Sequence, residues 1–429
     1  MSYSNFFKRY YSRTMNRKNG YHAVLLEKLL SHFDLDPREF QFIQIAGSAG
    51  KGSTAHFLSA ILTASDVAHG LFTGPHLSRY EERFQINGEE MPAPDLEKLS
   101  SEVEKGLKTF QEEQELGHMH LMILIGLLWY SRNGIGLVVY ENGVGGKSDP
   151  AILFDPLIAV LTEITKDHTQ LLGTEIEDIT ADKAAIIKSG TASVICGMRS
   201  PAARSYLRAL SETAAVPFLF FGEDFSVESR RSARGTSVFD YSGKKDLKRL
   251  ELSAPGYHQI QNAATAIAAV CELAGLTSAG NEEAIRLGLQ VVRIPARYEM
   301  VTKNGRNVVI DGAHNVLELE TLARNLKNDG MSPQAVIFSA SSNKNSTEMI
   351  NSVFYPEARY DIVPSPFAER RVNKEAVERM MDSTGLTWEW QADAGTALNK
   401  AFQSTEKGDT ILITGSLYFA GEARRLLMT

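Results

Sequence analysis

Cysteine is scarce in this chain of 429 residues, which contains only Cys196 and Cys271. Both lie in apolar stretches, and two thiols in a chain of this length do not make a framework of disulfide bonds. We therefore expect both to be buried free thiols in a protein that works in the reducing cytoplasm.

Long apolar runs and an excess of positive charge are also missing. The longest apolar run, residues 121–130, has ten residues, whereas a helix that crosses a bilayer needs about 20, so we expect a buried helix here. The 45 lysines and arginines are outnumbered by 52 aspartates and glutamates, which leaves a net charge of −7. This balance argues against nonspecific binding to nucleic acid. We expect neither nucleic acid nor a membrane as a partner.

Acidic residues are absent before Glu27, so the N-terminal stretch is basic and weakly resembles a transit peptide. Aromatic residues alternate with its cations as on an amphipathic helix, and no apolar segment of a signal peptide follows. We therefore predict a structural N-terminal helix. The cations are Lys8, Arg9, Arg13, Arg17 and Lys18, and the aromatic residues are Phe6, Phe7, Tyr10 and Tyr11.

Short apolar runs alternate with helical patterns through the first two thirds of the chain, which is typical of a parallel sheet covered by helices on both faces. A single core rarely exceeds about 250–300 residues, so two domains are expected. We predict an α/β N-terminal domain over residues 1–295, built on a parallel sheet that contains a phosphate-binding loop. Its expected strands lie within residues 40–47, 69–77, 135–146, 156–164 and 192–197.

A proline-containing connector at about 294–298 precedes a second alternation of strands and helices. This pattern predicts a smaller, Rossmann-like α/β C-terminal domain over residues 296–429. Its expected strands lie within residues 307–315, 334–341, 360–365 and 409–416.

The stretch "GSAGKGST" (47–54) lies between an expected strand and an expected helix. It departs from the usual phosphate-loop pattern G-x-x-x-x-G-K-[ST], because Ile45 stands at the first glycine and Gly52 follows Lys51. It still supplies glycines, a lysine and a helix N-terminus, which a phosphate site needs. A simple glycine turn is the alternative.

Residues 47–53 resemble the loop G-T-N-G-K-G-S of the folylpolyglutamate synthase and dihydrofolate synthase family, within the Mur ligase group. Seven further segments resemble that family in the same order. They are "TGPHLSRYEERFQING" (73–88), "ENGVGGKSD" (141–149), "DHTQLLGTEIEDITADKAAIIKSG" (167–190), "GYHQIQNAATAIAA" (256–269), "PARYEMV" (295–301), "DGAHN" (311–315) and "TGSLYFAGEAR" (414–424).

The resemblance implies an ATP-dependent ligase that joins an acid to an amino acid. A folate or dihydropteroate carboxylate attacks the γ-phosphate of ATP, and the amine of L-glutamate then displaces phosphate from the acyl phosphate. It also implies Mg²⁺ and a monomer, and leaves a monovalent cation open. The alternatives are a related ligase for a non-folate carboxylate, a noncatalytic ATP-binding relative and an unrelated phosphate-loop protein.

Residues of the loop are expected to bind the β- and γ-phosphates through backbone N–H groups and the Lys51 ammonium. Glu141 follows an apolar strand and is bracketed by glycines, and a carboxylate there suits Mg²⁺. A surface glutamate in a glycine turn is the alternative. Ser53 is a second expected metal ligand. The loop residues in question are Gly47, Ala49, Gly50, Lys51, Gly52 and Ser53.

Two further roles near the metal come from the resemblance. It implies that His168 is a metal ligand, although the residue type alone equally suggests a general base or a core histidine. It implies that Lys183 is carbamylated and acts in catalysis, although the pattern alone suggests a solvated helix lysine.

On the nucleotide side, the resemblance implies binding by Asn262, Arg297 and Asp311, and a catalytic role for His314 near phosphate or the incoming amine. The alternative for each of these residues is an ordinary structural role. Asn262 could cap a helix, Arg297 could form a salt bridge, and Asp311 and Asn315 could be turn residues.

Four departures from the family affect the metal and acceptor contacts. Gly74 replaces a serine that helps to bind Mg²⁺, Ala49 replaces an asparagine, and residues 149–152 lack the asparagine that ends D-A-T-N. Residues 116–126 replace the segment that holds the pterin, with His118 and His120 in place of its pattern. No Cys or third ligand clusters with this pair, so zinc is not favoured. The ligase machinery is therefore better supported than folate as the acceptor.

Overall fold

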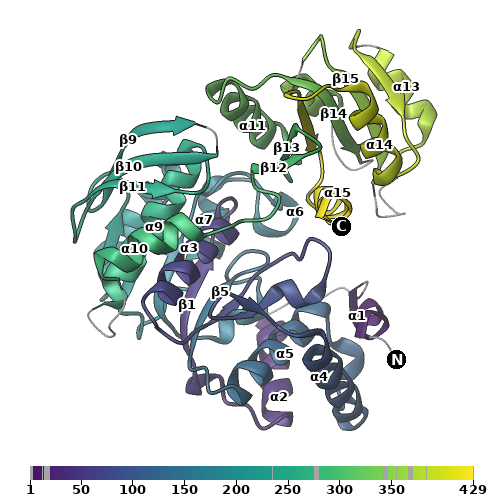
Figure 1. Cartoon of the computed structure of the whole chain (residues 1–429). Helices are drawn as coiled ribbons and strands as arrows, with labels where there is room; N and C mark the ends of the chain where they lie inside the picture. Colours follow the sequence, from purple (N-terminus) through teal and green to yellow (C-terminus); the bar gives the residue numbers. More distant parts are fainter. Residues whose placement is uncertain are drawn as a thin grey trace.

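The computed structural model describes residues 3–11, 13, 20–233, 235–274, 280–341, 346–353, 355–365, 371–382 and 384–428. Its strands form three sheets, of eight, three and six strands. Figure 1 shows the six-stranded sheet and its helices (green to yellow) as a group beside the other two sheets (purple to teal).

The eight-stranded sheet has the order β4-β3-β2-β5-β1-β6-β7-β8. In this order, the neighbours in the run β2-β5-β1-β6-β7-β8 pair in parallel, as predicted. The strands β3 and β4 add an antiparallel edge that the sequence did not predict. All five expected strands are present. The bounds are β1 (Gln41–Ala46), β2 (Gly70–Phe72), β3 (Phe84–Ile86), β4 (Glu89–Glu90), β5 (Leu137–Glu141), β6 (Pro156–Leu161), β7 (Ser193–Cys196) and β8 (Phe218–Phe220).

Helices cover both faces of this sheet and form three apolar cores among the described residues, one of which joins the sheet to α6, α7 and α8. A second core joins it to α3, α9 and α10, and a third joins it to α1, α2, α4 and α5. In α5 every residue from 120 to 130 is buried, so the expected buried helix is confirmed. The bounds are α2 (Tyr21–His32), α3 (Lys51–Ala64), α4 (Ala93–Gly106), α5 (His118–Arg132), α6 (Thr169–Leu172), α7 (Ile176–Ala184), α8 (Pro201–Thr213), α9 (Tyr257–Leu273) and α10 (Glu282–Val291).

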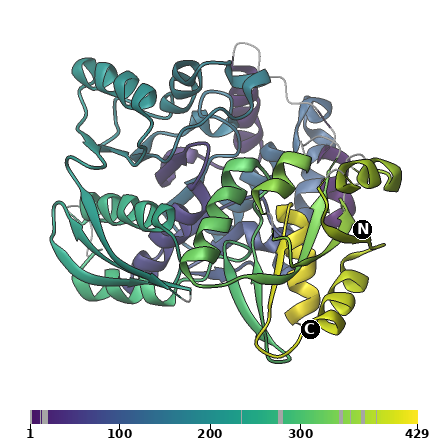
Figure 2. The same ribbon diagram turned by 90° about the horizontal axis from the view of Figure 1, so that it is seen from above.

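The three-stranded antiparallel sheet was not predicted. It comprises β9 (Ser226–Ala233), β10 (Thr236–Ser242) and β11 (Leu247–Leu252) and lies at the left of both views, away from the yellow C-terminal helices (Figures 1 and 2). Only one face of the sheet is apolar, and Phe239, Tyr241 and Leu250 pack there into the core of α3 and α9. β9 is "SVESRRSA", which contains no apolar run.

The six-stranded sheet has the order β12-β13-β17-β14-β15-β16 and is parallel except for the β12–β13 pair. The predicted α/β character of this region is confirmed, and the predicted division after residue 295 falls in the connector between α10 and β12. The bounds are β12 (Glu299–Lys303), β13 (Arg306–Ile310), β14 (Pro333–Ala340), β15 (Arg359–Pro364), β16 (Thr387–Trp390), β17 (Thr410–Thr414), α11 (Val316–Asn328), α12 (Ser346–Ser352), α13 (Lys374–Asp382), α14 (Ala394–Ser404) and α15 (Leu417–Met428).

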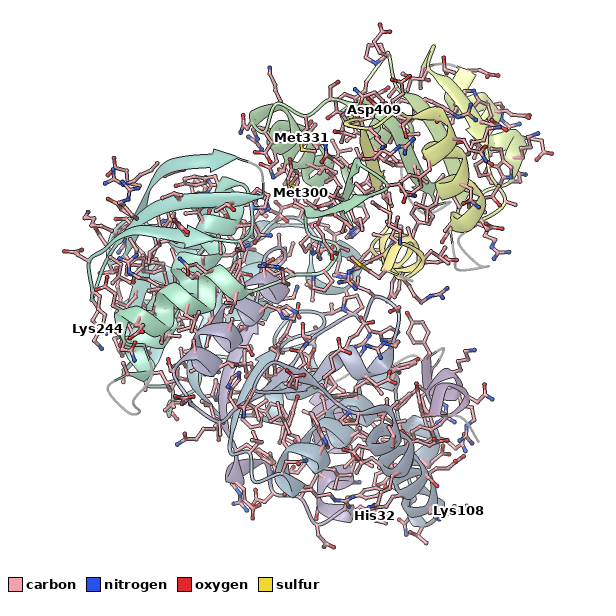
Figure 3. The ribbon with its side chains drawn as sticks, in the orientation of Figure 1. His32, Lys108, Lys244, Met300, Met331 and Asp409 are labelled. Atoms are coloured by element: carbon pink, nitrogen blue, oxygen red, sulfur yellow. The ribbon has the colours of Figure 1, made fainter. Side chains whose placement is uncertain are left out.

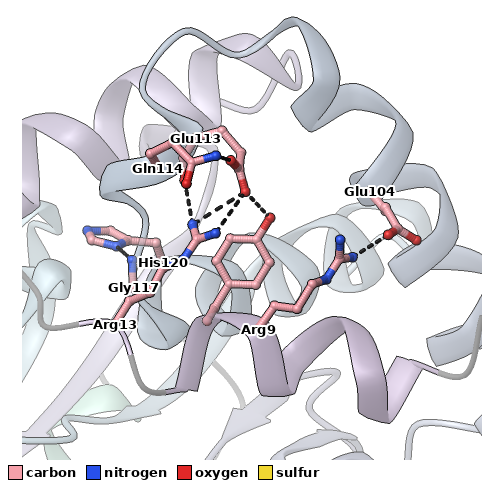
Figure 4. A network of polar contacts seen from close by, with 8 residues as sticks. Arg9, Arg13, Glu104, Glu113, Gln114, Gly117 and His120 are labelled. Atoms are coloured by element: carbon pink, nitrogen blue, oxygen red, sulfur yellow. Dashed lines mark hydrogen bonds and ion pairs between the residues drawn. The ribbon is translucent and has the colours of Figure 1, made fainter.

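The N-terminal helix is confirmed as α1 (Tyr3–Tyr11), whose side chains Phe6, Phe7 and Tyr10 are buried. Polar contacts anchor it to the segment after α4: Tyr10 and Arg13 both donate to Glu113 (Figure 4). The predicted cations Arg17 and Lys18 lie outside the described residues.

Both cysteines are buried free thiols, as expected. Within the described ranges, no helix has the length and apolarity that crossing a membrane requires.

Candidate active site

The loop from Gly47 to Gly50 connects the end of β1 to the first residue of α3, as the sequence predicted. Gly50 has φ 85°, in the left-handed region that favours glycine. A Cβ at Gly50 would collide with Oδ1 of Asn262, and a Cβ at Gly47 would collide with Oγ1 of Thr162. Neighbouring side chains thus press against the loop, and glycine is required at both positions.

Two lysines reach the first carbonyl of this loop. Lys51 Nζ donates to the Gly47 oxygen at 2.9 Å, and Lys183 Nζ donates to the same oxygen at 2.8 Å. Lys183 is 1% exposed, so the alternative of a solvated helix lysine is wrong. Burial, followed by the charge of Lys51, lowers the pKa of Lys183 to about 7.

Glu141 is the last residue of β5, which lies beside β1, and its side chain faces the start of α3. Both of its carboxylate oxygens would lie 3.3 Å from a Cβ at Gly52. The carboxylate accepts hydrogen bonds from the Thr73 hydroxyl and from the Gly74 N–H, the latter at 3.1 Å. Because Glu141 is 6% exposed, the alternative of a surface glutamate is wrong.

The position of Glu141 fits a magnesium ligand. Its carboxylate faces the helix turn that carries the buried Ser53, and both side chains offer the hard oxygen donors that Mg²⁺ prefers.

His168 precedes α6 with a left-handed backbone, φ 48°. Its side chain is 51% exposed, with Nε2 at 3.7 Å from the Asp167 carboxylate. Among the residues that the structure describes, no group of three His, Cys, Asp or Glu side chains is placed to hold a metal. The role of His168 as a ligand therefore stays a prediction.

The His118–His120 pair does not form a common site. His120 Nδ1 accepts from the Gly117 N–H at 3.0 Å (Figure 4), and its Nε2 lies 2.9 Å from the carbonyl oxygen of His22. The ring thereby joins the start of α5 to α2.

Asn262 lies in the second turn of α9, so it does not cap that helix. Its amide faces Gly50, and Nδ2 donates to Gln259 Oε1 at 3.2 Å. The structure thus brings this predicted nucleotide contact to the loop from a position 212 residues further along the chain.

Arg297 lies in the connector between two buried residues with left-handed backbones, Ala296 at φ 53° and Tyr298 at φ 52°. Such conformations are costly outside glycine and usually persist where a structure requires them. The charge of Arg297 contributes, after burial, to lowering the pKa values of His56 on α3 and His258 on α9, each to about 4. Arg297 is thus close to both α3 and α9.

Asp311 follows β13 and accepts hydrogen bonds from the Tyr298 N–H at 2.7 Å and from the Ala313 N–H at 2.8 Å. Burial raises the pKa of Asp311 to about 6, although nearby Arg297 opposes this rise. The predicted pair Arg297 and Asp311 is therefore in electrostatic contact.

His314 and Asn315 open α11. His314 Nδ1 lies 3.0 Å from the Gly312 oxygen and 3.2 Å from the Glu318 carboxylate. Asn315 accepts from the Glu318 N–H at 3.0 Å and caps α11, a role that the sequence analysis did not assign to it.

The C-terminal elements approach the first part of the chain at several points. A Cβ at Gly256, which precedes α9, would lie 2.7 Å from Nδ2 of Asn325 on α11. Met300 lies on the side of the C-terminal group that faces the three-stranded sheet (Figure 3), and a Cβ at Gly235 would lie 3.3 Å from its sulfur. The candidate residues therefore gather at a junction between the two groups of elements.

Family models and relatives agree with this geometry. The Mur ligase middle domain matches residues 45–270, and the Mur ligase glutamate ligase domain matches residues 296–417. A folylpolyglutamate synthase of Lacticaseibacillus casei is 30% identical over 96% of this chain and 95% of its own. This chain belongs to the folylpolyglutamate synthase and dihydrofolate synthase family of Mur ligases.

Solved structures of this family have the same fold. The crystal structure of folylpolyglutamate synthase from Thermotoga maritima is 27% identical, with a TM-score of 0.87 over 100% of this chain and 97% of its own. A second structure, named as a complex of a folylpolyglutamate synthase with AMPPCP, is 26% identical, with a TM-score of 0.82 over the full length of both chains.

Sequence reasoning missed Thr73 and Arg83. Thr73 bonds Glu141, and its position before Gly74 in the family segment was an available signal. Arg83 lies against Gly74, because a Cβ there would be 2.8 Å from the Arg83 Nη1. The departure at Gly74 thus makes room for a guanidinium, which only packing could show.

Proposed function

We propose that this chain adds L-glutamate to the carboxylate of a folate or dihydropteroate, using ATP and an acyl phosphate intermediate. The observation that carries the proposal is the arrangement around Gly47: a glycine loop at a helix start, two lysines on one carbonyl and the buried Glu141 beside it. Backbone N–H groups of residues 49–53 and Lys51 bind the phosphates and stabilise the charge that develops on them.

Mg²⁺ would be held by Glu141, Ser53 and His168, and it would supply positive charge to the phosphate oxygens when bound. We assign Asn262, Arg297 and Asp311 to nucleotide binding, and His314 to phosphate or the incoming amine. We further propose that the Lys183 amine is carbamylated, which would turn a buried cation into a carboxylate beside the loop.

We assign residues 1–295 to an ATP-binding domain and 296–429 to a glutamate ligase domain. We also propose a cytoplasmic monomer whose partners are small molecules. The residues assigned to nucleotide binding lie at the junction of the two groups of elements, which supports this division.

A ligase for another carboxylate is the second candidate. Met119 and His120 stand in the segment that differs from the family pattern, and Met119 Cε would lie 3.5 Å from a Cβ at Gly143. The altered segment therefore borders the glycine turn that follows Glu141, where an acceptor would enter.

One assay separates these functions. Phosphate release from ATP is measured with and without glutamate, using dihydropteroate, folates and a panel of other carboxylic acids. Glutamate-dependent release with folates supports the proposal, and release only with another acid supports the second candidate. Nucleotide binding without release for any acid would show a noncatalytic relative.

A further inference from the structure

The connector that carries Arg297 has a strained backbone. On either side of Arg297, the buried residues Ala296 and Tyr298 have left-handed φ values of 53° and 52°. Outside glycine, such a conformation costs free energy and persists only where neighbouring groups enforce it. The contacts that hold these two residues therefore decide where the Arg297 guanidinium points.

Tyr298 is held by the C-terminal elements. Its N–H donates to Asp311 Oδ2 at 2.7 Å, and its hydroxyl donates to Asp329 Oδ2 at 3.0 Å. Since Asp311 is itself assigned to nucleotide binding, this half of the connector is tied directly to the candidate site.

Ala296 is held by Glu299, the first residue of β12. The Ala296 N–H donates to Glu299 Oε2 at 2.9 Å, and the Ala296 oxygen accepts from the Gly312 N–H at 2.8 Å. The same carboxylate also binds Arg424 on α15, whose Nε lies 2.9 Å from Oε1 and 2.8 Å from Oε2. Glu299 thus joins the strained connector to the last helix of the chain.

The ion pair between Glu299 and Arg424 is sheltered from solvent, with side chains that are 17% and 33% exposed. Fully exposed ion pairs contribute little, because water and salt screen them. A partly buried carboxylate that loses its partner, however, keeps the cost of its own desolvation. The pair is therefore suited to hold the Ala296 N–H firmly.

The helix that supplies Arg424 also contacts the first part of the chain. A Cβ on Gly421 would lie 2.7 Å from the Leu77 oxygen, so α15 packs directly on the segment after β2. Gly421 and Arg424 are three positions apart, and residues at this spacing share one side of a helix. Figure 1 shows α15 at the edge of the C-terminal group that is nearest to the purple and blue elements. Packing at this junction therefore fixes the position of Arg424.

We propose that Glu299 is a positioning residue for nucleotide binding: together with Arg424 it holds Ala296 in its left-handed conformation and thereby keeps Arg297 directed at the nucleotide. This inference rests on the assignment of Arg297 to nucleotide binding under the proposed function. A purely structural ion pair is the alternative, and it would stabilise the fold without affecting nucleotide affinity.

Nucleotide affinity in Glu299→Gln and in Glu102→Gln tests the proposal. Glu102 is a matched control, because it forms a two-contact ion pair with Arg132 between the C-terminal ends of α4 and α5. We expect Glu299→Gln to weaken the binding of a fluorescent ATP analogue about tenfold, since an amide cannot replace the charged contact with Arg424. Glu102→Gln should change this affinity by less than about twofold. Arg424→Lys, which keeps the charge, should lose less affinity than Arg424→Met.

Ala296→Gly separates positioning from a structural role. Glycine adopts a left-handed backbone without strain, so this connector depends less on Glu299 for its conformation. In the Ala296→Gly background, Glu299→Gln should weaken nucleotide binding by about threefold or less instead of tenfold. A double-mutant cycle on the nucleotide affinity measures this coupling.

Hydrogen exchange provides a readout that needs no ligand. The Ala296 amide should exchange about tenfold faster in Glu299→Gln than in the wild type, because the acceptor of its N–H is no longer held by an ion pair. The exchange of this amide should be unchanged in Glu102→Gln.

The outcomes distinguish this inference from the function on which it rests. Unchanged nucleotide affinity in Glu299→Gln, with or without a lower Tm, would overturn the inference and leave the ligase function standing. An equal loss of affinity with alanine and with glycine at position 296 would also overturn it, since Glu299 would then not act through Ala296. A wild type that binds nucleotide and shows the expected coupling, but turns over no acid, would support the inference while the ligase function fails.

Discussion

Lys51 and Lys183 both donate to one oxygen, that of Gly47, although they lie 132 residues apart in the chain. Two ammonium groups on one carbonyl repel each other, which is one reason why the pKa of Lys183 falls to about 7. In this arrangement, the loop is held by positive charge before any phosphate binds, and an arriving triphosphate would relieve the repulsion.

Lys51→Met should abolish most of the catalysis. We expect kcat/KM to fall by about 100-fold or more, because a charge that stabilises the transferring phosphate is lost. Glutamate-dependent phosphate release gives the rate, and a fluorescent ATP analogue gives the affinity. Lys108→Met is the control, since Lys108 is exposed and lies far from the loop (Figure 3). Equal rates in the two variants would exclude Lys51 from the site.

Gly50→Ala should weaken nucleotide binding through a collision as well as through backbone strain. Gly134→Ala is its matched control, because Gly134 has a similar left-handed φ of 68°, yet nothing lies within 4 Å of a Cβ there. Strain alone costs about 1–2 kcal/mol, so both variants should have a lower Tm. Only Gly50→Ala displaces Asn262, and its nucleotide affinity should fall about tenfold further. Similar affinities in both variants would contradict the contact.

Lys183 should take up CO₂ as the pH rises from 6 to 8. Only the neutral amine reacts with CO₂, and a pKa of about 7 makes the neutral fraction rise from about a tenth to about nine tenths over this range. A carbamate signal in ¹³C NMR with labelled bicarbonate would grow accordingly. The signal should vanish in Lys183→Met and remain in Lys188→Met, a half-buried neighbour in sequence. If the wild-type enzyme gives no carbamate signal, the Lys183 amine is not carbamylated and the prediction is wrong.

Gly74→Ser, which introduces the residue of the family pattern, should lower the thermal stability of this protein. The new Cβ would meet the buried Arg83 at 2.8 Å from its Nη1, so the guanidinium must move and the free energy of unfolding should fall by about 1–3 kcal/mol. In an Arg83→Met background the same change should have a much smaller effect, because the collision is gone. A double-mutant cycle on the free energy of unfolding measures this coupling. Additive effects would show that Gly74 and Arg83 act independently.

Strand positions were predictable because each buried strand is a short apolar run that ends at a polar cluster, as at Glu141 and after Ala46. The glycine loop was recognisable because its lysine and its glycines are adjacent in sequence. The sheet β9–β11 was not, since only one of its faces is apolar and β9 contains several charged residues. The antiparallel edge β3–β4 was missed for a similar reason, as β4 has only two residues.

By itself, the sequence determined the loop, the alternation of strands and helices and the family, because these depend on neighbouring residues and on their order along the chain. Tertiary structure alone decided that β5 lies beside β1, which brings Glu141 to Gly52. It also decided that Asn262 closes on Gly50 and that Lys183 is buried. Burial and charge balance are properties of what packs around a side chain, and those neighbours come from distant parts of the chain.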